Sequence, residues 1–384
     1  DNRPCCLEVV MLAPDGKPLA IHFAAQDVDK KKQVHVKSSQ IAVRFHGESW
    51  PGLKKQLQDR LVLDESLDEL GVYFAVFDGH GGTQVPDHLA KFLHKNILIQ
   101  YRQMKIQPGS RDERIAAAIK AAFLQTDKDI LEGASRKGYQ TVGSTAVVVM
   151  LHGNPKLQIP LRLVVANLGD SRAVLCRGGE AVALCEDHKP NKPEERRRIE
   201  AQGGLVLQVR GTWRVAASSN PNNSTKSSRR EYQGLAMSRS FGDLHFKQPT
   251  GLTIAKPDVH IYKLKENDMF VVVATDGVFD VLSNQEVSDL AIRHWDDPAE
   301  AASKVVREAF QRGSEDNITA CVIQLGWVDK HSGAWAKQRL KKAAWQIKKK
   351  DESSTSPKAT MKLEDIVASQ KARKEAVDDM DMFG

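Results

Sequence analysis

Residues 72–82 have the sequence VYFAVFDGHGG. Six apolar residues, rich in aromatic and β-branched side chains, break off at Asp78 and Gly79. A short run of this kind, closed by glycine, is typical of a buried strand that ends in a tight turn. Two later stretches have the same form, LVVANLGDSR at 163–172 and MFVVVATDG at 269–277. The chain therefore contains three predicted strands that each end beside an aspartate.

The three aspartates are Asp78, Asp170 and Asp276. If the strand ends meet at one edge of a sheet, the carboxylates converge, and clustered carboxylates repel one another unless a cation lies between them. The alternative is a turn, because Asp-Gly marks a hairpin more often than a ligand. Three such sites in one chain, with a fourth candidate in SEDN at 314–317, favour a metal site.

The composition of the 384 residues, 41% hydrophobic and 27% charged, is that of a soluble globular protein with one large domain or two ordinary ones. We expect no membrane span, because no apolar stretch approaches the ~20 residues that one needs. The first residues lack the pattern of a signal peptide. The five cysteines are scattered without metal-ligand spacing, which predicts reduced thiols in a cytoplasmic or nuclear protein.

The net charge of +7 is modest and much of it lies in short basic runs. A nucleic-acid-binding protein would show a basic face interleaved with aromatic residues on a recognisable module, and none is found. We therefore expect no direct nucleic-acid binding. The runs at 341–342 and 348–350 are either solvated surface or nuclear localisation signals.

Changes in pattern divide the chain into three parts. Residues 1–40 are an N-terminal extension or an edge of the main fold, 41–328 form the main domain, and 329–384 form a basic and then acidic tail. Within the main domain, 216–231 is rich in Ser, Asn and Arg without apolar periodicity and is predicted to be an exposed insertion. In the tail, a basic amphipathic helix near 340–347 either binds a partner protein or a membrane surface, or packs on its own domain.

The main domain alternates strands with helices. Helical periodicity is found at 87–100, 115–131 and 300–310. Strands are predicted at 145–151, 163–168, 173–177, 259–264, 270–274 and 318–325. Hairpin-like connections favour an α+β protein, with antiparallel sheets and segregated helices, over a parallel arrangement.

Eight stretches, in the same order as in the family, resemble the type 2C metal-dependent serine/threonine protein phosphatases. They are FAVFDGHGG (74–82), GSTA (143–146), ANLGDSR (166–172), EDHKP (186–190), RIEAQGG (198–204), GLAMSRSFGD (234–243), TDGVFD (275–280) and SEDN (314–317). The resemblance covers about residues 53–325. It implies a β-sandwich of two antiparallel sheets flanked on both faces by helices, in α-β-β-α layers, and the removal of phosphate from serine and threonine of phosphoproteins.

The resemblance also implies a dinuclear metal site. Oxygen ligands without a Cys or His cluster suit Mn²⁺ or Mg²⁺ rather than Zn²⁺. By similarity, Asp78 bridges two ions, the Gly79 carbonyl reaches one of them, and Asp276 and Asp316 complete the first. A water activated between the two ions would attack phosphorus in line, so that no covalent intermediate is needed.

Further roles follow from the same resemblance. Asp170 and Asp280 match positions that bind a third, looser ion in some relatives, although an Asx-turn cap is an equal alternative for Asp170. His80 matches the general acid that protonates the departing oxygen, and the alternative is a turn histidine bonded to backbone. Thr145 and Asp243 match family motifs as structural supports.

The segment KKQLQDR at 54–60 departs from the family pattern. Gln58 replaces the usual Glu, which predicts a weaker second metal site, whereas Asp59 is kept. Lys54 stands where an arginine is expected and would bind phosphate as a point charge. Lys55 or Arg60 are the alternatives to Lys54. Gln58 also keeps open a pseudophosphatase that acts as a binding or scaffold protein; a nucleotide hydrolase lacks any supporting motif.

Overall fold

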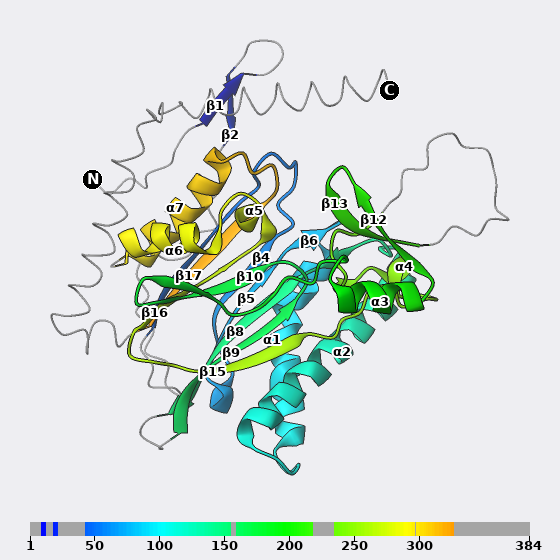
Figure 1. The fold of residues 1–384 in the computed structure, drawn as a ribbon, viewed down its shortest axis with the longest axis horizontal. Coiled ribbons are helices and arrows are strands. Elements are labelled where there is room, and N and C mark those ends of the chain that lie inside the picture. Colours follow the sequence, from blue (N-terminus) through cyan, green and yellow to red (C-terminus); the bar gives the residue numbers. More distant parts are fainter. Residues whose placement is uncertain are drawn as a thin grey trace. The chain divides into compact units, whose positions relative to one another are not determined.

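The computed structural model describes residues 9–12, 18–21, 43–154, 159–217, 234–295 and 297–325 (Figure 1). Strands β1 (Val9–Leu12) and β2 (Pro18–Ile21) pair antiparallel and belong to a small unit of their own, 1–33. All other described elements belong to a second unit, 34–384. The predicted tail helix and residues 218–231 of the predicted insertion lie outside the described residues.

Two five-stranded antiparallel sheets form the centre of the second unit (Figure 1). The first sheet has the order β15 (Asp258–Lys263), β9 (Ile159–Leu168), β8 (Ala146–Asn154), β5 (Val72–Phe77) and β4 (Arg60–Ser66). The second has the order β11 (Glu180–Ala183), β10 (Arg172–Arg177), β16 (Asp268–Ala274), β17 (Ile318–Leu325) and β3 (Val43–Trp50). Every neighbouring pair is antiparallel.

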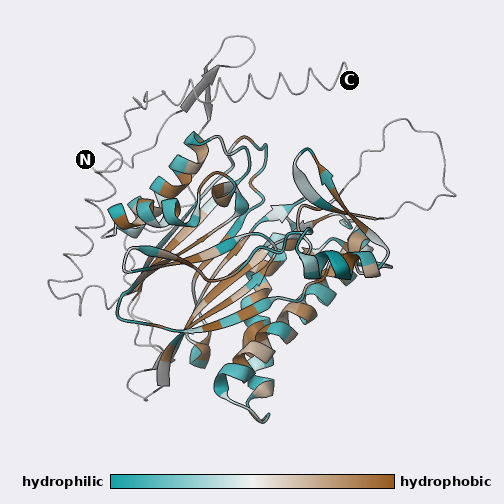
Figure 2. Cartoon of the chain, in the orientation of Figure 1, coloured by the Kyte–Doolittle hydropathy of each residue, from teal (hydrophilic) through white to brown (hydrophobic). Residues whose placement is uncertain are grey.

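The burial of strand β5 on both faces explains why its sequence is a continuous apolar run. All six of its residues are buried. Val72, Phe74 and Val76 belong to the core between the two sheets, whereas Tyr73 and Phe77 belong to the core on the opposite face of their sheet. Successive side chains of a strand point to opposite faces, so a strand with both faces covered is apolar throughout. Figure 2 shows the apolar colouring of these central strands.

Helices cover the outer face of each sheet. Helices α1 (Gln84–Met104) and α2 (Arg111–Lys137) pack on the first sheet, and α6 (Asn284–Arg293) and α7 (Pro298–Gln311) pack on the second. Helix α2 begins at a capping box between Ser110 and Glu113 and ends at Gly138, whose φ of 76° is left-handed. The predicted α+β sandwich with helices on both faces is confirmed.

The remaining described elements of the second unit are smaller. They are a 3-10 helix η1 (Asp68–Leu70), β6 (Gly79–His80), β7 (Gly143–Ser144), α3 (Pro193–Ala201), β12 (Gly204–Val209), β13 (Thr212–Ala217), β14 (Phe241–Gly242), α4 (Leu244–Lys247) and α5 (Asp276–Phe279). In the part of the chain that the structure describes, no helix has the length and apolar character of a membrane span.

One sequence prediction about these elements is wrong. Ala216 was expected to begin an exposed loop, but it lies in β13, is 3% exposed and pairs with Leu205 of β12. Val215 also pairs with Leu235 through two backbone hydrogen bonds of 2.8 and 3.1 Å. The polar composition after Ala217 hid the end of a strand that pairs with the neighbouring β12 and with Leu235.

Candidate active site

The aspartates that follow the apolar runs converge from both sheets. Asp78 follows β5 of the first sheet, Asp276 follows β16 of the second, and Asp170 lies in the turn where the chain crosses from β9 to β10. The strand ends therefore do not meet at the edge of one sheet, and the site forms between the two sheets. The carboxylates are nevertheless close: burial, and then the charges of Asp276, Asp59, Asp170 and Asp316, raise the pKa of Asp78 well above its usual value.

The backbone of Asp78 is fixed by Thr145. The Asp78 N–H donates to Thr145 Oγ1 at 3.3 Å, and the Thr145 N–H donates to the Asp78 carbonyl at 2.9 Å. Thr145 Oγ1 also lies 2.7 Å from Ser171 Oγ, so the residue after Asp170 is held by the same hydroxyl. The predicted role of Thr145 as a structural support is confirmed.

Gly79 and Gly277 allow four chain segments to approach one another. A Cβ atom on Gly277 would lie 2.0 Å from the Asn317 carbonyl oxygen, and one on Gly79 would lie 2.6 Å from the Gln58 carbonyl oxygen. Neither Asp-Gly pair forms a hairpin turn, because Gly79 lies in β6 and Gly277 lies in α5. Both glycines therefore serve close backbone packing, which brings 58–59 beside Asp78 and 316–317 beside Asp276.

Asn317 ties the 51–59 segment to the site, a role that the sequence did not predict. Its side chain accepts from the Gln58 N–H at 2.7 Å and donates to the carbonyls of Pro51 and Gln56 at 2.9 and 3.1 Å. Its position after Asp316 in SEDN was the available signal. Its partners lie about 260 residues earlier in the chain, and no local pattern predicts them.

Asp59 is 2% exposed and lies inside the cluster. The Thr275 hydroxyl donates to its Oδ2 at 3.2 Å, whereas Oδ1 is buried and has no hydrogen-bond partner within the described part of the chain. Burial, with a further contribution from the charge of Asp316, raises the pKa of Asp59 to about 7. Asp59 thus presents an unsatisfied oxygen, as a ligand or a hydrogen-bond acceptor would.

The Arg60 side chain forms hydrogen bonds with residues close to it in the structure. Its guanidinium donates to Asp87 Oδ1 at 2.6 Å and to the carbonyls of Leu57 and Asp59 at 3.0 and 2.8 Å. These bonds shape the turn that carries Asp59.

Two lysines form ion pairs with carboxylates of the cluster. Lys54 Nζ lies 3.0 Å from Asp316 Oδ2, with both side chains about half exposed. Lys189 Nζ lies 2.6 Å from Asp170 Oδ2, and that carboxylate is fully buried. Burial lowers the pKa of Lys189, but the charge of Asp170 outweighs it and the pKa is raised. Lys189, within EDHKP, is a site residue that sequence reasoning missed.

Asp280 completes the acidic group at the end of α5. Its N–H donates to the Asp276 carbonyl at 2.8 Å. Burial, followed by the charges of Asp170, Asp280 and Asp316, raises the pKa of Asp276 well above its usual value. Burial and the charge of Asp170 also raise the pKa of Asp280, against the opposing charge of Lys189.

His80 lies beside Asp243 and is not a turn histidine bonded to backbone. Its Nε2 is 3.0 Å from both carboxylate oxygens of Asp243, and its side chain is 25% exposed. Burial lowers the pKa of His80, but the Asp243 carboxylate outweighs burial and the pKa is raised. The carboxylate thus favours the protonated form of the imidazole, which is the form that a proton donor needs.

The donor set fits hard divalent cations. All the convergent groups are carboxylates, and buried oxygens of Asp59 and Asp170 have no hydrogen-bond partner among the described residues. Among those residues, no three His, Cys, Asp or Glu side chains stand in an arrangement that could hold a metal ion as they lie. The ammonium groups of Lys54 and Lys189 neutralise part of the negative charge of these carboxylates. Burial and mutual repulsion raise the pKa values of Asp78 and Asp276, as expected for clustered carboxylates.

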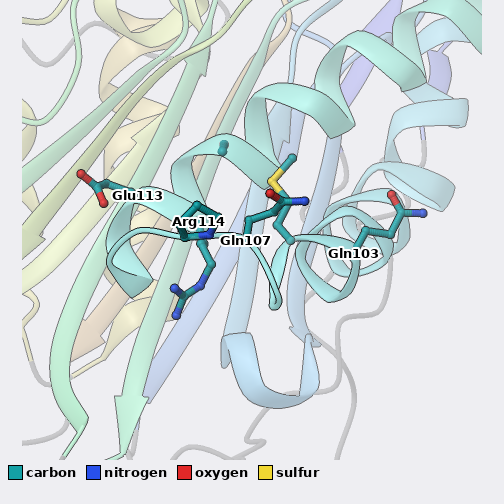
Figure 3. Close-up of a pocket in the computed structure, with 7 residues that line it drawn as sticks. Gln103, Gln107, Glu113 and Arg114 are labelled. Atoms are coloured by element: carbon teal, nitrogen blue, oxygen red, sulfur yellow. The ribbon is translucent and has the colours of Figure 1, made fainter.

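A pocket of about 550 Å³ lies elsewhere, at the junction of α1 and α2 (Figure 3). Gln103, Gln107, Glu113 and Arg114 line it, together with Met104, Pro108 and Ala117. None of these belongs to the acidic cluster. Glu113 is part of the α2 capping box, and Arg114 donates to the Gly109 carbonyl, so both charges have structural roles.

Comparison with known proteins agrees with the geometry. Residues 43–318 match the family described as "Protein phosphatase 2C". The chain is 37% identical over 278 residues to "Probable protein phosphatase 2C 59" of Arabidopsis thaliana, covering 72% of this chain and 78% of the relative. It is 36% identical over 278 residues to "Probable protein phosphatase 2C 45" of Oryza sativa subsp. japonica, covering 72% and 85%.

Solved structures share the fold. The serine-threonine phosphatase 2C from Toxoplasma gondii superposes with a TM-score of 0.60 at 20% identity, covering 74% of this chain and 95% of that one. A sex determining protein of C. elegans gives 0.59 at 22% identity, covering 74% and 64%. With the match of the family over most of the chain, these findings show that the chain belongs to the protein phosphatase 2C family of protein serine/threonine phosphatases.

Proposed function

We propose that this phosphatase hydrolyses phosphoserine and phosphothreonine monoesters in phosphoproteins with two Mn²⁺ or Mg²⁺ ions held by its carboxylate cluster. The observation that carries the proposal is the convergence of buried and partly buried carboxylates from both sheets, whose charges raise one another's pKa. When bound, the ions activate a water molecule and neutralise the charge of the phosphate group.

The ligands that we propose are those implied by the resemblance to the family, and the positions of the side chains support them. Asp78, at the centre of the cluster, would be shared by both ions, with the Gly79 carbonyl at one of them. Asp276 and Asp316 would complete the first ion. Each of these carboxylates raises the pKa of Asp78, which supports their placement around it.

Three further acidic residues lie around these ligands. Asp59, with its unsatisfied Oδ1, would bind at the second ion through water. Asp170 and Asp280 would hold a third, looser ion. Lys189 pairs with Asp170 and counters the effect of that carboxylate on Asp280, so it would compete with such an ion.

Side chains of the protein would bind the phosphate group and donate the proton to the leaving group. As the water oxygen bonds to phosphorus, the bond from phosphorus to the seryl or threonyl oxygen breaks. His80 gives its proton to that oxygen, so the products are inorganic phosphate and a free hydroxyl side chain. Lys54, half exposed beside Asp316, would bind a phosphate oxygen as a point charge.

The test is phosphate release from a phosphothreonine peptide, with Mn²⁺ or Mg²⁺ against chelator, for the wild type, Asp276→Asn and Asp129→Asn. Asp129 is an exposed residue of α2 outside the cluster, which makes it a matched control. We expect metal-dependent turnover that only Asp276→Asn abolishes. Turnover that persists in chelator, or that Asp276→Asn retains, would refute the metal mechanism.

Gln58 supports a second candidate, a pseudophosphatase that binds phosphoproteins without hydrolysing them. A neutral side chain replaces a carboxylate, and two lysines already neutralise part of the cluster. If the wild type is inactive at every metal concentration and Gln58→Glu is active, the second metal site is the defect. If both are inactive yet bind the phosphopeptide, the binding role holds.

A cytoplasmic or nuclear location is also part of the proposal. Cys176, Cys185 and Cys321 are free thiols in the structure, which supports a reducing compartment. Fluorescence of the tagged full chain in cells tests this assignment.

A further inference from the structure

The pair formed by His80 and Asp243 has a geometry that structural support alone does not require. Both oxygens of the Asp243 carboxylate lie 3.0 Å from His80 Nε2. The carboxylate is fully buried, although burying a charge is costly unless it is paired. Resting on the proposed function, we propose that Asp243 is a positioning residue that fixes the His80 imidazole toward the departing seryl or threonyl oxygen.

The carboxylate is itself held in one orientation. Ser240 Oγ donates to Asp243 Oδ2 at 2.6 Å, and the Asp243 N–H donates to the Val142 carbonyl at 2.9 Å. Asp243 has a φ of 50°, a left-handed conformation that is strained for a residue with a Cβ. The chain keeps an aspartate at a position that favours glycine, which indicates that its side chain is needed there.

Gly143 makes room for the pair. A Cβ atom at Gly143 would lie 2.2 Å from Asp243 Oδ2 and 2.4 Å from His80 Nε2. The imidazole and the carboxylate therefore meet directly over the backbone of β7, with no space for another side chain between them.

A second layer anchors the turn that carries Asp243. Asp127 of α2 accepts from the Gly242 N–H at 2.9 Å and from Lys247 Nζ at 2.6 Å. Lys247 also donates to the Ser240 carbonyl at 2.7 Å. The side chains of Asp127 and Lys247 are 10% and 7% exposed, so this ion pair is buried. It holds the turn but contacts His80 nowhere, which makes it the natural control.

The position of Asp243 differs from that of a metal ligand. Both of its oxygens face the imidazole, and Oδ2 also accepts from Ser240 Oγ. Its effect on the reaction must therefore pass through His80. A general acid matters in proportion to how poorly the leaving group departs without a proton.

The experiment compares two substrates in the full chain with Mn²⁺. The phosphothreonine peptide has an alkoxide leaving group that needs a proton, whereas 4-nitrophenyl phosphate has a leaving group that is stable without one. We expect Asp243→Asn to lower kcat on the peptide by roughly 10²-fold, the scale of general acid catalysis, and on the aryl phosphate by less than about tenfold. Asp127→Asn should lower both by the same factor, because it disturbs the turn alone.

Two further variants separate positioning from folding. In a His80→Gln background, Asp243→Asn should cause no additional substrate-selective loss, because the route through the imidazole is already gone. Ser240→Ala removes one hydrogen bond to the carboxylate and should show the same selectivity at smaller size. If thermal unfolding shows that Asp243→Asn does not fold, the Ser240→Ala variant tests the positioning role in its place.

A failure of the positioning role and a failure of the proposed function would give different results. Wild-type protein without metal-dependent turnover on either substrate would overturn the proposed function itself. An active wild type, with Asp243→Asn impaired equally on both substrates or on neither, would overturn the positioning role alone. A selective loss that persists in the His80→Gln background would also overturn it, because Asp243 would then act without His80.

Discussion

Gly277 shows how one absent side-chain atom places two candidate ligands. Its Cα faces the Asn317 carbonyl so closely that a Cβ would lie 2.0 Å from that oxygen. Asp276 precedes Gly277 and Asp316 precedes Asn317, so Gly277→Ala must push the two aspartates apart. We expect a loss of roughly 10²-fold in kcat/KM, the scale of a misplacement of about 1 Å, and a raised Mn²⁺ requirement.

The matched control for this change is Gly138→Ala. Gly138 has a φ of 76° but no atom within 4 Å of its would-be Cβ. Gly138→Ala should lower the free energy of unfolding by about 1–2 kcal/mol through backbone strain. This is close to the 1–3 kcal/mol expected for overpacking in Gly277→Ala. Urea unfolding and a Mn²⁺ titration measure both quantities. Equal activity in the two variants would contradict the placement of Asp276 and Asp316 argued above.

Individual residues were predictable where the chemistry is local. Asp78, Asp170 and Asp276 follow apolar runs, and that pattern alone marked them. Lys189 and Asn317 were not predictable in this way, because their roles depend on partners far along the chain. The same holds for the contact of His80 with Asp243, which spans 163 residues of sequence.

At the scale of elements, helix α3 is joined to the first sheet by an ion-pair network that is buried at Glu195 and half exposed at Asp258. Glu195 of α3 accepts from Arg239 Nη2 at 2.6 Å and from Arg198 Nη2 at 3.0 Å. Arg239 Nη1 also donates at 2.9 Å to Asp258 of β15, which lies 3.1 Å from His188 Nε2. Burial raises the pKa of Glu195, but the hydrogen bonds from Arg239, Ser238 and Arg198 outweigh it and lower the pKa to about 2.

This pKa gives a stability prediction with a definite sign. The folded protein binds fewer protons at Glu195 than the unfolded chain, so the stabilisation is fully present above pH 4.5 and is lost as the pH falls toward about 2. Glu195→Gln should lower the free energy of unfolding at pH 7 by about 3 kcal/mol, because each unit of pKa shift corresponds to about 1.4 kcal/mol. It should also flatten the loss of stability between pH 5 and 3.

Glu200→Gln is the control for Glu195, because it breaks an exposed pair with Arg196 on the same helix. Such a pair contributes about 0.3–0.5 kcal/mol. Denaturant unfolding at several pH values measures both variants. If Glu195→Gln keeps the wild-type dependence on pH, the network does not fasten α3.

Elements with strong periodicity were predictable, and weakly patterned ones were not. The helices at 87–100, 115–131 and 300–310 and all six predicted strands are present. Helix α3 escaped prediction because its sequence, PEERRRIEA, has little apolar periodicity and its position depends on Arg239. Which sheet a strand joins is also not encoded locally, since β5 and β16 have the same apolar pattern in opposite sheets.

At the scale of the whole molecule, the sandwich holds like charges together. The core between the sheets, with Phe74, Val165 and Val273 among its buried residues, fixes the spacing of the strands. The carboxylates at the strand ends cannot move apart without disturbing that core, because protein interiors are close-packed. The fold therefore carries an electrostatic cost that a bound cation relieves.

For this reason we expect Asp276→Asn to stabilise the protein when metal is removed, and the wild type to be the more stable of the two when metal is bound. In chelator at pH 7, the variant should unfold at a higher temperature than the wild type, because burial and three neighbouring carboxylates disfavour the ionised Asp276. A gain of about 1 kcal/mol corresponds to roughly 2–4 °C. In Mn²⁺ at 100 times the dissociation constant, the wild type gains about 2.7 kcal/mol and the order reverses. Calorimetry with Asp129→Asn as control tests this, and a variant less stable than the wild type in chelator would contradict the repulsive cluster.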